Sequence, residues 1–293
     1  MVLLRSLLFV PANRADMIEK ARTAPADALV LDMEDSVPLS EKPAARTTVA
    51  RMAPGLALRG QMVFVRVNGL STGLTKEDVE AVVAKDVYGL SLPKVESAED
   101  ITRADSLIRA AEFNQGLKAG GIRLIPWIET AVGVLHAYEI LSASPRLIGV
   151  AFGADDFTRD MGVERTKEAT EQFFPRASIG LAARAAGVLA LDTPWVDFKD
   201  EAGLIRDTNQ ARLLGFKGRF CIHPRQIEAV NRVFTPSPQE IEQARKTVAA
   251  YDAAAAQGKG AIQYEGQMVD IAGVERLRKF LTLADEMAKK QTG

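Results

Sequence analysis

The feature that most constrains the fold is an eightfold alternation of short apolar runs with longer helical segments. The runs are rich in Val, Ile, Leu and Phe, as in strands buried on both faces, and the segments between them are rich in Ala, Glu and Arg. The predicted strands cover residues 5–10, 28–33, 62–67, 89–93, 122–128, 147–152, 188–192 and 218–222. Parallel strands joined by crossover helices produce this pattern. Eight such units in about 230 residues favour an α/β fold of the closed (β/α)8 or TIM barrel type over an open sheet, which usually has fewer strands.

Helical segments follow each predicted strand and continue past the eighth. The predicted helices cover residues 15–24, 42–52, 76–84, 98–116, 131–142, 177–186, 202–215 and 224–234. A further helix over residues 238–256 ends at a Gln-Gly-Lys-Gly linker, after which residues 261–270 are expected to be extended and 274–289 helical. We therefore predict a barrel domain over residues 1–235. Residues 236–293 are expected to form a C-terminal helical extension that packs over the barrel mouth or a neighbouring subunit.

Composition excludes several classes of partner. Lys and Arg (37) nearly balance Asp and Glu (38), so no global field would attract nucleic acid or an anionic membrane. The single cysteine, Cys221, lies in a predicted strand and is interpreted as a buried structural thiol of a reducing compartment. The apolar opening over residues 1–10 is interrupted by Arg5, and no other run is long enough to span a membrane. The expected location is the cytoplasm.

Polar residues gather at the C-terminal ends of the predicted strands. In a (β/α)8 barrel these ends converge on one face, where active sites are built. The other interpretation is that the charges merely solvate loop starts, but their recurrence at the same end in six units favours a shared site. The residues are Asp32, Glu34, Asp35, Arg66, Asn68, Lys94, Glu129, Asp155, Asp156 and His223.

Two apolar runs, over residues 123–129 and 147–156, stop on carboxylates. Mg²⁺ takes oxygen ligands and keeps positions for water and substrate, so acids at neighbouring strand ends indicate a Mg²⁺ site, with Mn²⁺ as an alternative. Glu129 is the firmer ligand because it ends an apolar strand; a structural salt bridge is the other interpretation. Because side chains alternate along a strand, Asp155 and Asp156 are not expected to face the same ion.

The chain contains only two histidines, which gives little support for a histidine-based metal site or a Ser-His-Asp triad. His136 falls within a predicted helix and is interpreted as a surface residue. His223 follows the eighth strand, where its ring could carry a proton.

Eight segments in a fixed order resemble the motifs of the citrate lyase β-subunit-like, malyl-CoA and citramalyl-CoA lyase group of the HpcH/HpaI aldolase superfamily. They cover residues 5–14, 31–37, 65–68, 92–97, 128–131, 152–157, 222–224 and 266–270. Among them are Ile-Glu-Thr-Ala at 128–131, Phe-Gly-Ala-Asp-Asp-Phe at 152–157 and Gly-Gln-Met-Val-Asp at 266–270. Each motif is weak alone, but several in this order are specific. The resemblance covers nearly the whole chain. It implies a TIM barrel, a Mg²⁺ site, a CoA thioester substrate and a homo-oligomer, either a trimer or a hexamer.

The resemblance assigns roles around the expected metal. It makes Asp156 the second ligand beside Glu129, and it leaves Asp155 to contact substrate. Arg66 would bind substrate near the metal, where its planar guanidinium suits a carboxylate or an enolate oxygen. Glu34 and Asp35 are catalytic candidates that would orient Arg66 and metal-bound water. The alternative is that Arg66 forms a purely structural ion pair with Glu34 or Asp35.

The resemblance also implies which residues bind CoA. Phe9, Arg14 and Lys20 match positions that hold the nucleotide, with an aromatic ring on the ligand and cations at its phosphates. Without the family, Phe9 would be a core residue and Lys20 a charge on a helix surface. Ile222 and His223 would form part of the pocket wall.

Asp270, in the tail, matches an aspartate that related malyl-CoA lyases supply from an adjacent subunit to exchange a proton with the acetyl methyl group. The other interpretation of Asp270 is a helix N-cap.

The implied reaction is the retro-Claisen cleavage of a 3-hydroxyacyl-CoA, such as (S)-citramalyl-CoA or malyl-CoA, to acetyl-CoA and pyruvate or glyoxylate. One alternative is a citrate lyase β subunit acting on a citryl thioester of an acyl carrier protein. Such subunits are expected to lack the extended tail. Another alternative is a barrel that binds CoA thioesters without turning them over.

Overall fold

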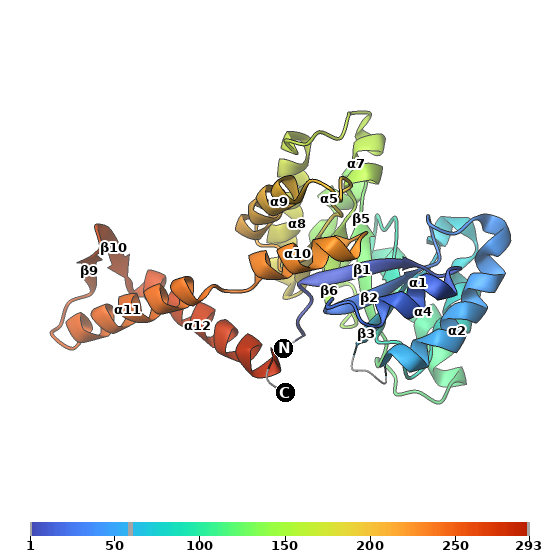
Figure 1. Ribbon diagram of the computed structural model, residues 1–293, viewed down its shortest axis with the longest axis horizontal. Helices are drawn as coiled ribbons and strands as arrows, with labels where there is room; N and C mark the ends of the chain where they lie inside the picture. The colour runs from blue at the N-terminus through green and yellow to red at the C-terminus, as the bar shows by residue number, and fades with distance from the viewer. Residues whose placement is uncertain (1, 58–60, 292–293) are drawn as a thin grey trace. The chain divides into compact units, whose positions relative to one another are not determined.

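The computed structural model describes residues 2–57 and 61–291 and contains a closed barrel of parallel strands (Figure 1). The strands are β1 (Ser6–Pro11), β2 (Ala28–Asp32), β3 (Met62–Arg66), β4 (Gly89–Leu92), β5 (Arg123–Ile128), β6 (Gly149–Phe152), β7 (Leu189–Asp192) and β8 (Gly218–Cys221). Each strand pairs with the next in sequence, and β8 pairs with β1 to close the barrel. The predicted (β/α)8 barrel is therefore confirmed, with every strand within two residues of its predicted bounds.

Helices connect the strands as the crossover pattern requires. They are α1 (Ala15–Ala21), α2 (Lys42–Ala57), α3 (Thr75–Val82), α4 (Ala98–Asn114), α5 (Ala131–Leu135), α6 (Ala137–Ser142), α7 (Ala154–Met161), α8 (Phe173–Ala186), α9 (Glu201–Leu213) and α10 (Ile227–Phe234). Short 3-10 turns lie at Leu39–Glu41, Leu70–Thr72, Thr170–Gln172 and Pro224–Gln226.

Two helical predictions need correction. The segment over residues 131–142 is two helices, because the backbone of His136 leaves the helical region (φ −94°, ψ 9°) and its Nδ1 lies 3.1 Å from the Glu96 carbonyl oxygen. Helix α7 is missing from the predicted helices, because the eight residues between Gly153 and Gly162 are too few to show a long apolar period. Since α7 begins at Ala154, Asp155 and Asp156 lie in the first turn of a helix and not at the end of a strand.

The barrel interior is packed with aromatic rings. The Phe9 ring centroid lies 5.7 Å from that of Trp127 and 5.2 Å from that of Phe220, and the Trp127 and Phe220 centroids are 4.5 Å apart. Such ring pairs contribute beyond the area that they bury. The Trp127 indole donates to Ser91 Oγ at 2.6 Å, which satisfies its buried N–H. Cys221 is buried as expected, and burial raises the pKa of its thiol to about 12, so it is an inert structural residue.

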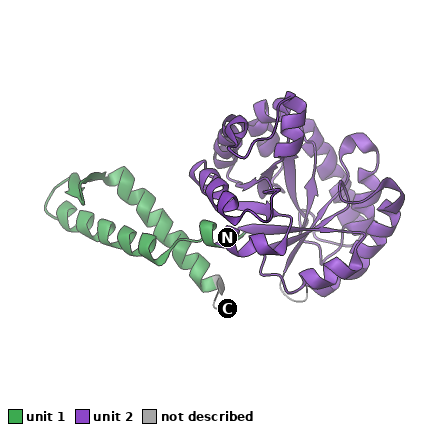
Figure 2. Cartoon of the chain, turned by 45° about the horizontal axis from the view of Figure 1, so that its top comes forward, with its two compact units in different colours: residues 1–3, 232–293 green, residues 4–231 purple. Residues whose placement is uncertain are grey.

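The chain divides into two compact units, the barrel over residues 4–231 and a second unit that combines residues 2–3 with the segment that starts at Arg232 (Figure 2). The second unit contains α11 (Pro238–Ala255), an antiparallel hairpin of β9 (Ala261–Tyr264) and β10 (Gln267–Asp270), and α12 (Ile271–Gln291). Tyr251, Val269 and Val274 form its small core. No helix in the described ranges is long and apolar enough to cross a lipid bilayer.

Candidate active site

A cavity of about 420 Å³ opens at the C-terminal ends of the barrel strands. Its walls combine apolar side chains with charged ones and include Phe9, Asp32, Asp35, Arg66, Trp127, Glu129, Asp155, Asp156 and Ile222. Because these residues come from six strands or the loops that follow them, the closure of the barrel is what brings them together.

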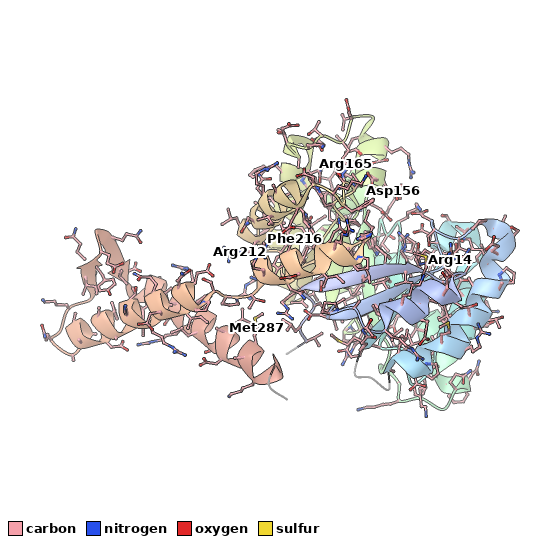
Figure 3. All side chains as sticks on the ribbon, viewed as in Figure 1. Arg14, Asp156, Arg165, Arg212, Phe216 and Met287 are labelled. Carbon is pink, nitrogen blue, oxygen red and sulfur yellow. The ribbon has the colours of Figure 1, made fainter. Side chains whose placement is uncertain are left out.

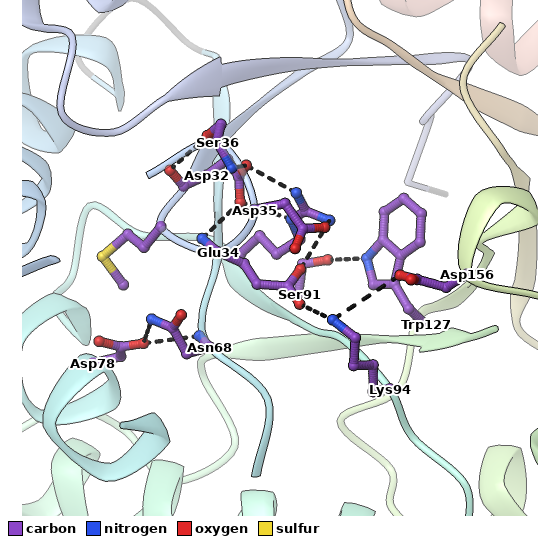
Figure 4. Close-up of polar contacts among 12 residues, drawn as sticks. Asp32, Glu34, Asp35, Ser36, Asn68, Asp78, Ser91, Lys94, Trp127 and Asp156 are labelled. Carbon is purple, nitrogen blue, oxygen red and sulfur yellow. Dashed lines mark hydrogen bonds and ion pairs between the residues drawn. The ribbon is translucent and has the colours of Figure 1, made fainter. Parts of the chain in front are cut away.

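Arg66, the last residue of β3, is held by acids from the neighbouring strand β2 and its loop. Its Nε donates to Asp32 Oδ1 at 2.7 Å and its Nη2 to Asp32 Oδ2 at 2.8 Å, a bidentate pair (Figure 4). Its Nη1 lies 3.0 Å from Glu34 Oε2 and 3.5 Å from Asp35 Oδ2. Burial opposes the charge of Arg66, but the bonds to Asp32 outweigh burial and raise the pKa of the guanidinium. Arg66 is therefore a permanent cation with a fixed orientation.

The guanidinium of Arg66 also lies over aromatic faces. Its central carbon is 4.7 Å from the Phe9 ring centroid and 5.7 Å from that of Trp127. Such cation–π contacts are attractive and stack the planar group on the ring. Phe9 therefore lines the cavity and orients Arg66 at the same time.

The loop that carries the acids is fixed through its main chain. Asp32 accepts hydrogen bonds from the backbone N–H of Glu34 at 2.9 Å and of Ser36 at 3.1 Å. The Lys42 ammonium donates to the carbonyl oxygens of Met33 and Glu34, both at 2.8 Å. Lys42 is buried, so its ammonium belongs to the network that holds this loop.

Glu129 and Asp156 line the same cavity and are close enough for their charges to interact. The Glu129 side chain is buried, and its Oε1 accepts a hydrogen bond from the backbone N–H of Lys94 at 2.7 Å. Burial, with the nearby charge of Asp156, raises the pKa of Glu129 to about 8. Asp156 is 16% exposed and lies 4.0 Å from Lys94 Nζ, and it also pairs with Arg159 of its own helix.

This donor set suits a hard divalent cation. A buried carboxylate that resists ionisation until a cation arrives is a natural ligand position, and Mg²⁺ commonly uses only one or two carboxylates with water and substrate. Within the described ranges, no group of three or more His, Cys, Asp or Glu side chains is arranged to hold a metal ion. Glu129 and Asp156 would therefore need oxygen ligands from substrate or water.

Gly153 makes room for the Glu129 carboxylate. A Cβ atom at position 153 would collide with Glu129 Oε2 and with its Cβ and Cδ atoms. The glycine that separates β6 from α7 is thus required for the approach of the two elements that carry the acid pair.

Asp155 points away from Asp156, but for a different reason from the one expected. In a helix, consecutive side chains diverge by roughly 100°. Asp155 Oδ1 pairs with Arg165 Nη1 at 2.8 Å, and the side chain is 70% exposed at the cavity edge. Figure 3 shows Asp156 and Arg165 in the part of the molecule where Figure 1 labels α7.

The other predicted binding residues lie outside the cavity wall, except Ile222. Arg14 and Lys20 are exposed on or next to α1, and both approach Asp16, at 3.0 and 3.9 Å. Ile222 lines the cavity and is 43% exposed. His223 stacks on Phe198, with ring centroids 4.8 Å apart, and its side chain accepts a hydrogen bond from the backbone N–H of Arg225.

Asp270 belongs to the second compact unit and ends β10. Its Oδ1 accepts a hydrogen bond from the backbone N–H of Gly273 at 2.8 Å, which is the N-cap contact considered for this residue. The side chain is exposed, so an N-cap role leaves it accessible for chemistry.

Sequence reasoning gave too little weight to two residues. Lys94 is predicted only as one of the polar residues at strand ends, although it contacts three acids of the site. Trp127 was not singled out, although its ring lines the cavity and lies near Arg66. The available signal for Trp127 was its place one residue from the end of a strand that leads to Glu129.

The chain is similar to several known proteins. Residues 5–224 match the HpcH/HpaI aldolase/citrate lyase family. The citrate lyase subunit beta of Leuconostoc mesenteroides is 40% identical over 281 residues, which cover 96% of this chain and 93% of the relative. The human mitochondrial citramalyl-CoA lyase is 35% identical over 300 residues, covering 98% of this chain and 87% of the relative. Among solved structures, the protein CitE of Mycobacterium tuberculosis in complex with magnesium, acetoacetate and coenzyme A is 32% identical and covers 96% of this chain and 97% of its own, with a TM-score of 0.79.

Proposed function

Because this chain belongs to the HpcH/HpaI aldolase/citrate lyase family, we propose that it cleaves a 3-hydroxyacyl-CoA by a retro-Claisen reaction. The proposed substrates are (S)-citramalyl-CoA or malyl-CoA, with acetyl-CoA and pyruvate or glyoxylate as products. Its relatives are named as carbon–carbon lyases, and the human one as a citramalyl-CoA lyase. The observation that carries the proposal is that the buried Glu129 shares one cavity with a second acid, Asp156, and with the fixed cation Arg66.

Glu129 and Asp156 would hold Mg²⁺, or Mn²⁺ in its place, as the magnesium complex of the M. tuberculosis relative supports. When bound, the cation supplies a Lewis acid that polarises the substrate's hydroxyl and carboxylate oxygens. Glu129 is held in place for this task by the Lys94 N–H, and Gly153 leaves space for its carboxylate.

Arg66 would stabilise the charge that develops during cleavage. The bond between C2 and C3 of the acyl chain breaks, its electron pair moves into the thioester to form an enolate, and the hydroxyl proton passes to solvent water as the oxo acid forms. The thioester oxygen then carries negative charge, which a fixed guanidinium can stabilise without reorganisation. Asp32 and Glu34 hold the guanidinium in place, so they act as positioning residues, and Asp35 adds a weaker contact at the rim.

The enolate must then gain a proton at its terminal carbon to become acetyl-CoA. We assign this step to Asp270 of a neighbouring subunit in a trimer or hexamer. The exposed carboxylate of Asp270 at the end of β10 is compatible with such a role.

CoA would approach along the β1 side of the cavity. Phe9 lines the wall, and Arg14 and Lys20 present two exposed cations that could meet phosphate groups. Ile222 and Asp155, which also line the cavity, would contact the substrate, and His223 would support the wall through its neighbour Ile222.

A citryl thioester is the second candidate substrate, and one observation favours it. The citrate lyase subunit of L. mesenteroides aligns with 96% of this chain, so the match extends into the tail. The expectation that such subunits lack the tail is therefore wrong, and the tail does not separate the two functions.

Turnover distinguishes these functions. We would incubate the protein with Mg²⁺ and (S)-citramalyl-CoA, malyl-CoA or citryl-CoA, and follow the release of pyruvate, glyoxylate or oxaloacetate. Cleavage that is lost in Glu129→Ala supports the lyase. Absence of cleavage of all three substrates by protein that still binds CoA contradicts the proposal and favours either a citrate lyase β subunit that needs a carrier-bound thioester or a barrel that only binds thioesters.

A further inference from the structure

Lys94, the second residue after β4, connects the two acidic parts of the site. Its Nζ lies 2.5 Å from Glu34 Oε1 and 4.0 Å from Asp156 Oδ2 (Figure 4). Its backbone N–H donates to Glu129 Oε1 at 2.7 Å. One residue therefore contacts both members of the proposed cation pair and the acid that holds Arg66.

The backbone of Lys94 adopts a conformation that favours glycine. Its φ is +55°, in the left-handed region, which L-residues with a side chain rarely adopt. In this conformation the N–H meets Glu129 while the side chain reaches Glu34 and Asp156. Strain of this kind is kept where the surrounding structure requires both contacts at once.

Lys94 also lines a second cavity, of about 500 Å³, that shares Glu129 and Asp156 with the first. Its side chain is 35% exposed, so the ammonium has space to move. A divalent cation between Glu129 and Asp156 would bring two positive charges close to Nζ and compete with it for Asp156. Glu34, in contrast, would remain available to the ammonium.

We propose that Lys94 is a positioning residue whose ammonium is an exchangeable counter-ion of the cation site. Without a divalent cation it bridges Asp156 and Glu34, and it yields Asp156 when the cation binds while it keeps its contact with Glu34. Lys94 thereby weakens cation binding but holds Glu34 against Arg66. This inference rests on the cation pair of the proposed function and is independent of which thioester is cleaved.

The test is calorimetric titration of the substrate-free protein with Mg²⁺ alone. Lys94→Met removes the ammonium, and Lys94→Gly removes it while permitting positive φ, so the second variant keeps the fold even if the first does not. Both are expected to bind Mg²⁺ about tenfold more tightly than the wild type, because a like charge beside the cation is gone. Lys94→Arg keeps the charge and is expected to bind within about threefold of the wild type.

The matched control is Arg103→Met, which removes a positive charge from the wall of the same second cavity. Its affinity for Mg²⁺ is expected to stay near that of the wild type. Unchanged or weaker binding in both Lys94→Met and Lys94→Gly would overturn the inference, as would equal tightening in Arg103→Met. A wild type that binds no Mg²⁺ would instead refute the cation pair of the proposed function, and the inference with it.

Turnover provides a second readout with the opposite sign. The same Lys94 variants are expected to have a kcat lowered by about tenfold or more, since Glu34 loses the partner that holds it against Arg66. Tighter cation binding combined with slower turnover would support the inference. A purely structural role would weaken both properties.

Discussion

Glu129 makes the stability of the protein depend on pH in a direction opposite to that of most carboxylates. Its pKa is about 8 in the folded state, because of burial and the charge of Asp156, against an ordinary value of 4.5. Between these values the folded state keeps a proton that the unfolded state releases. The free energy of unfolding therefore falls as pH rises from about 4.5 to 8.

The magnitude follows from the size of the pKa shift. At about 1.4 kcal/mol per pKa unit, the shift of Glu129 corresponds to a loss of up to about 5 kcal/mol of stability between pH 4.5 and 8. Glu129→Gln cannot ionise and removes this contribution. Mg²⁺ restores stability at high pH in the wild type, since a ligand that binds the folded state alone stabilises it by mass action.

The assay is urea unfolding of metal-free protein from pH 5.5 to 8.5, with the wild type and Glu129→Gln measured side by side. Subtracting the variant removes the contribution of every other titrating group. We expect the wild type to lose several kcal/mol of unfolding free energy relative to the variant across this range. Adding about 5 mM Mg²⁺ is expected to reverse most of this loss at pH 8.5. A difference between the two proteins that does not change with pH would refute the reasoning.

Three further predictions concern turnover and binding. Arg66→Lys loses the bidentate geometry and is expected to lower kcat about a hundredfold while leaving Mg²⁺ affinity unchanged; a drop of less than threefold in a steady-state assay would contradict the assigned role. Gly153→Ala forces the Glu129 carboxylate out of place and is expected to weaken Mg²⁺ binding about tenfold in calorimetry, and wild-type affinity would show that the close contact is not needed. Arg14→Ala is expected to raise KM for the CoA thioester about fivefold at low salt with kcat retained, whereas Asp16→Asn, which frees Arg14, is expected to lower KM; a change of the same sign in both variants would argue against phosphate binding by Arg14.

The sequence determined the barrel because the signal for it is local. Each buried strand is an apolar run, each crossover helix has its own period, and both can be recognised without their neighbours. The same locality placed Arg66 and Glu129 at strand ends, and hence on one face. Helix α7 cannot be recognised in this way, because it is short and lacks a long apolar period. Asp155 and Asp156 were therefore expected to diverge as neighbours in a strand, whereas they diverge as neighbours in a helix.

Only the tertiary structure decided which polar groups touch. The bidentate pair of Arg66 with Asp32 joins residues 34 positions apart, and the contact of Lys94 with Glu34 spans 60. Such contacts depend on strand register and on side-chain direction, which local periodicity does not specify. The raised pKa of Glu129 likewise requires burial and a second carboxylate from another strand unit. Sequence periodicity therefore determined where the site lies, while barrel closure decided its charges and contacts, because electrostatic interactions depend on distances in space and not on separation along the chain.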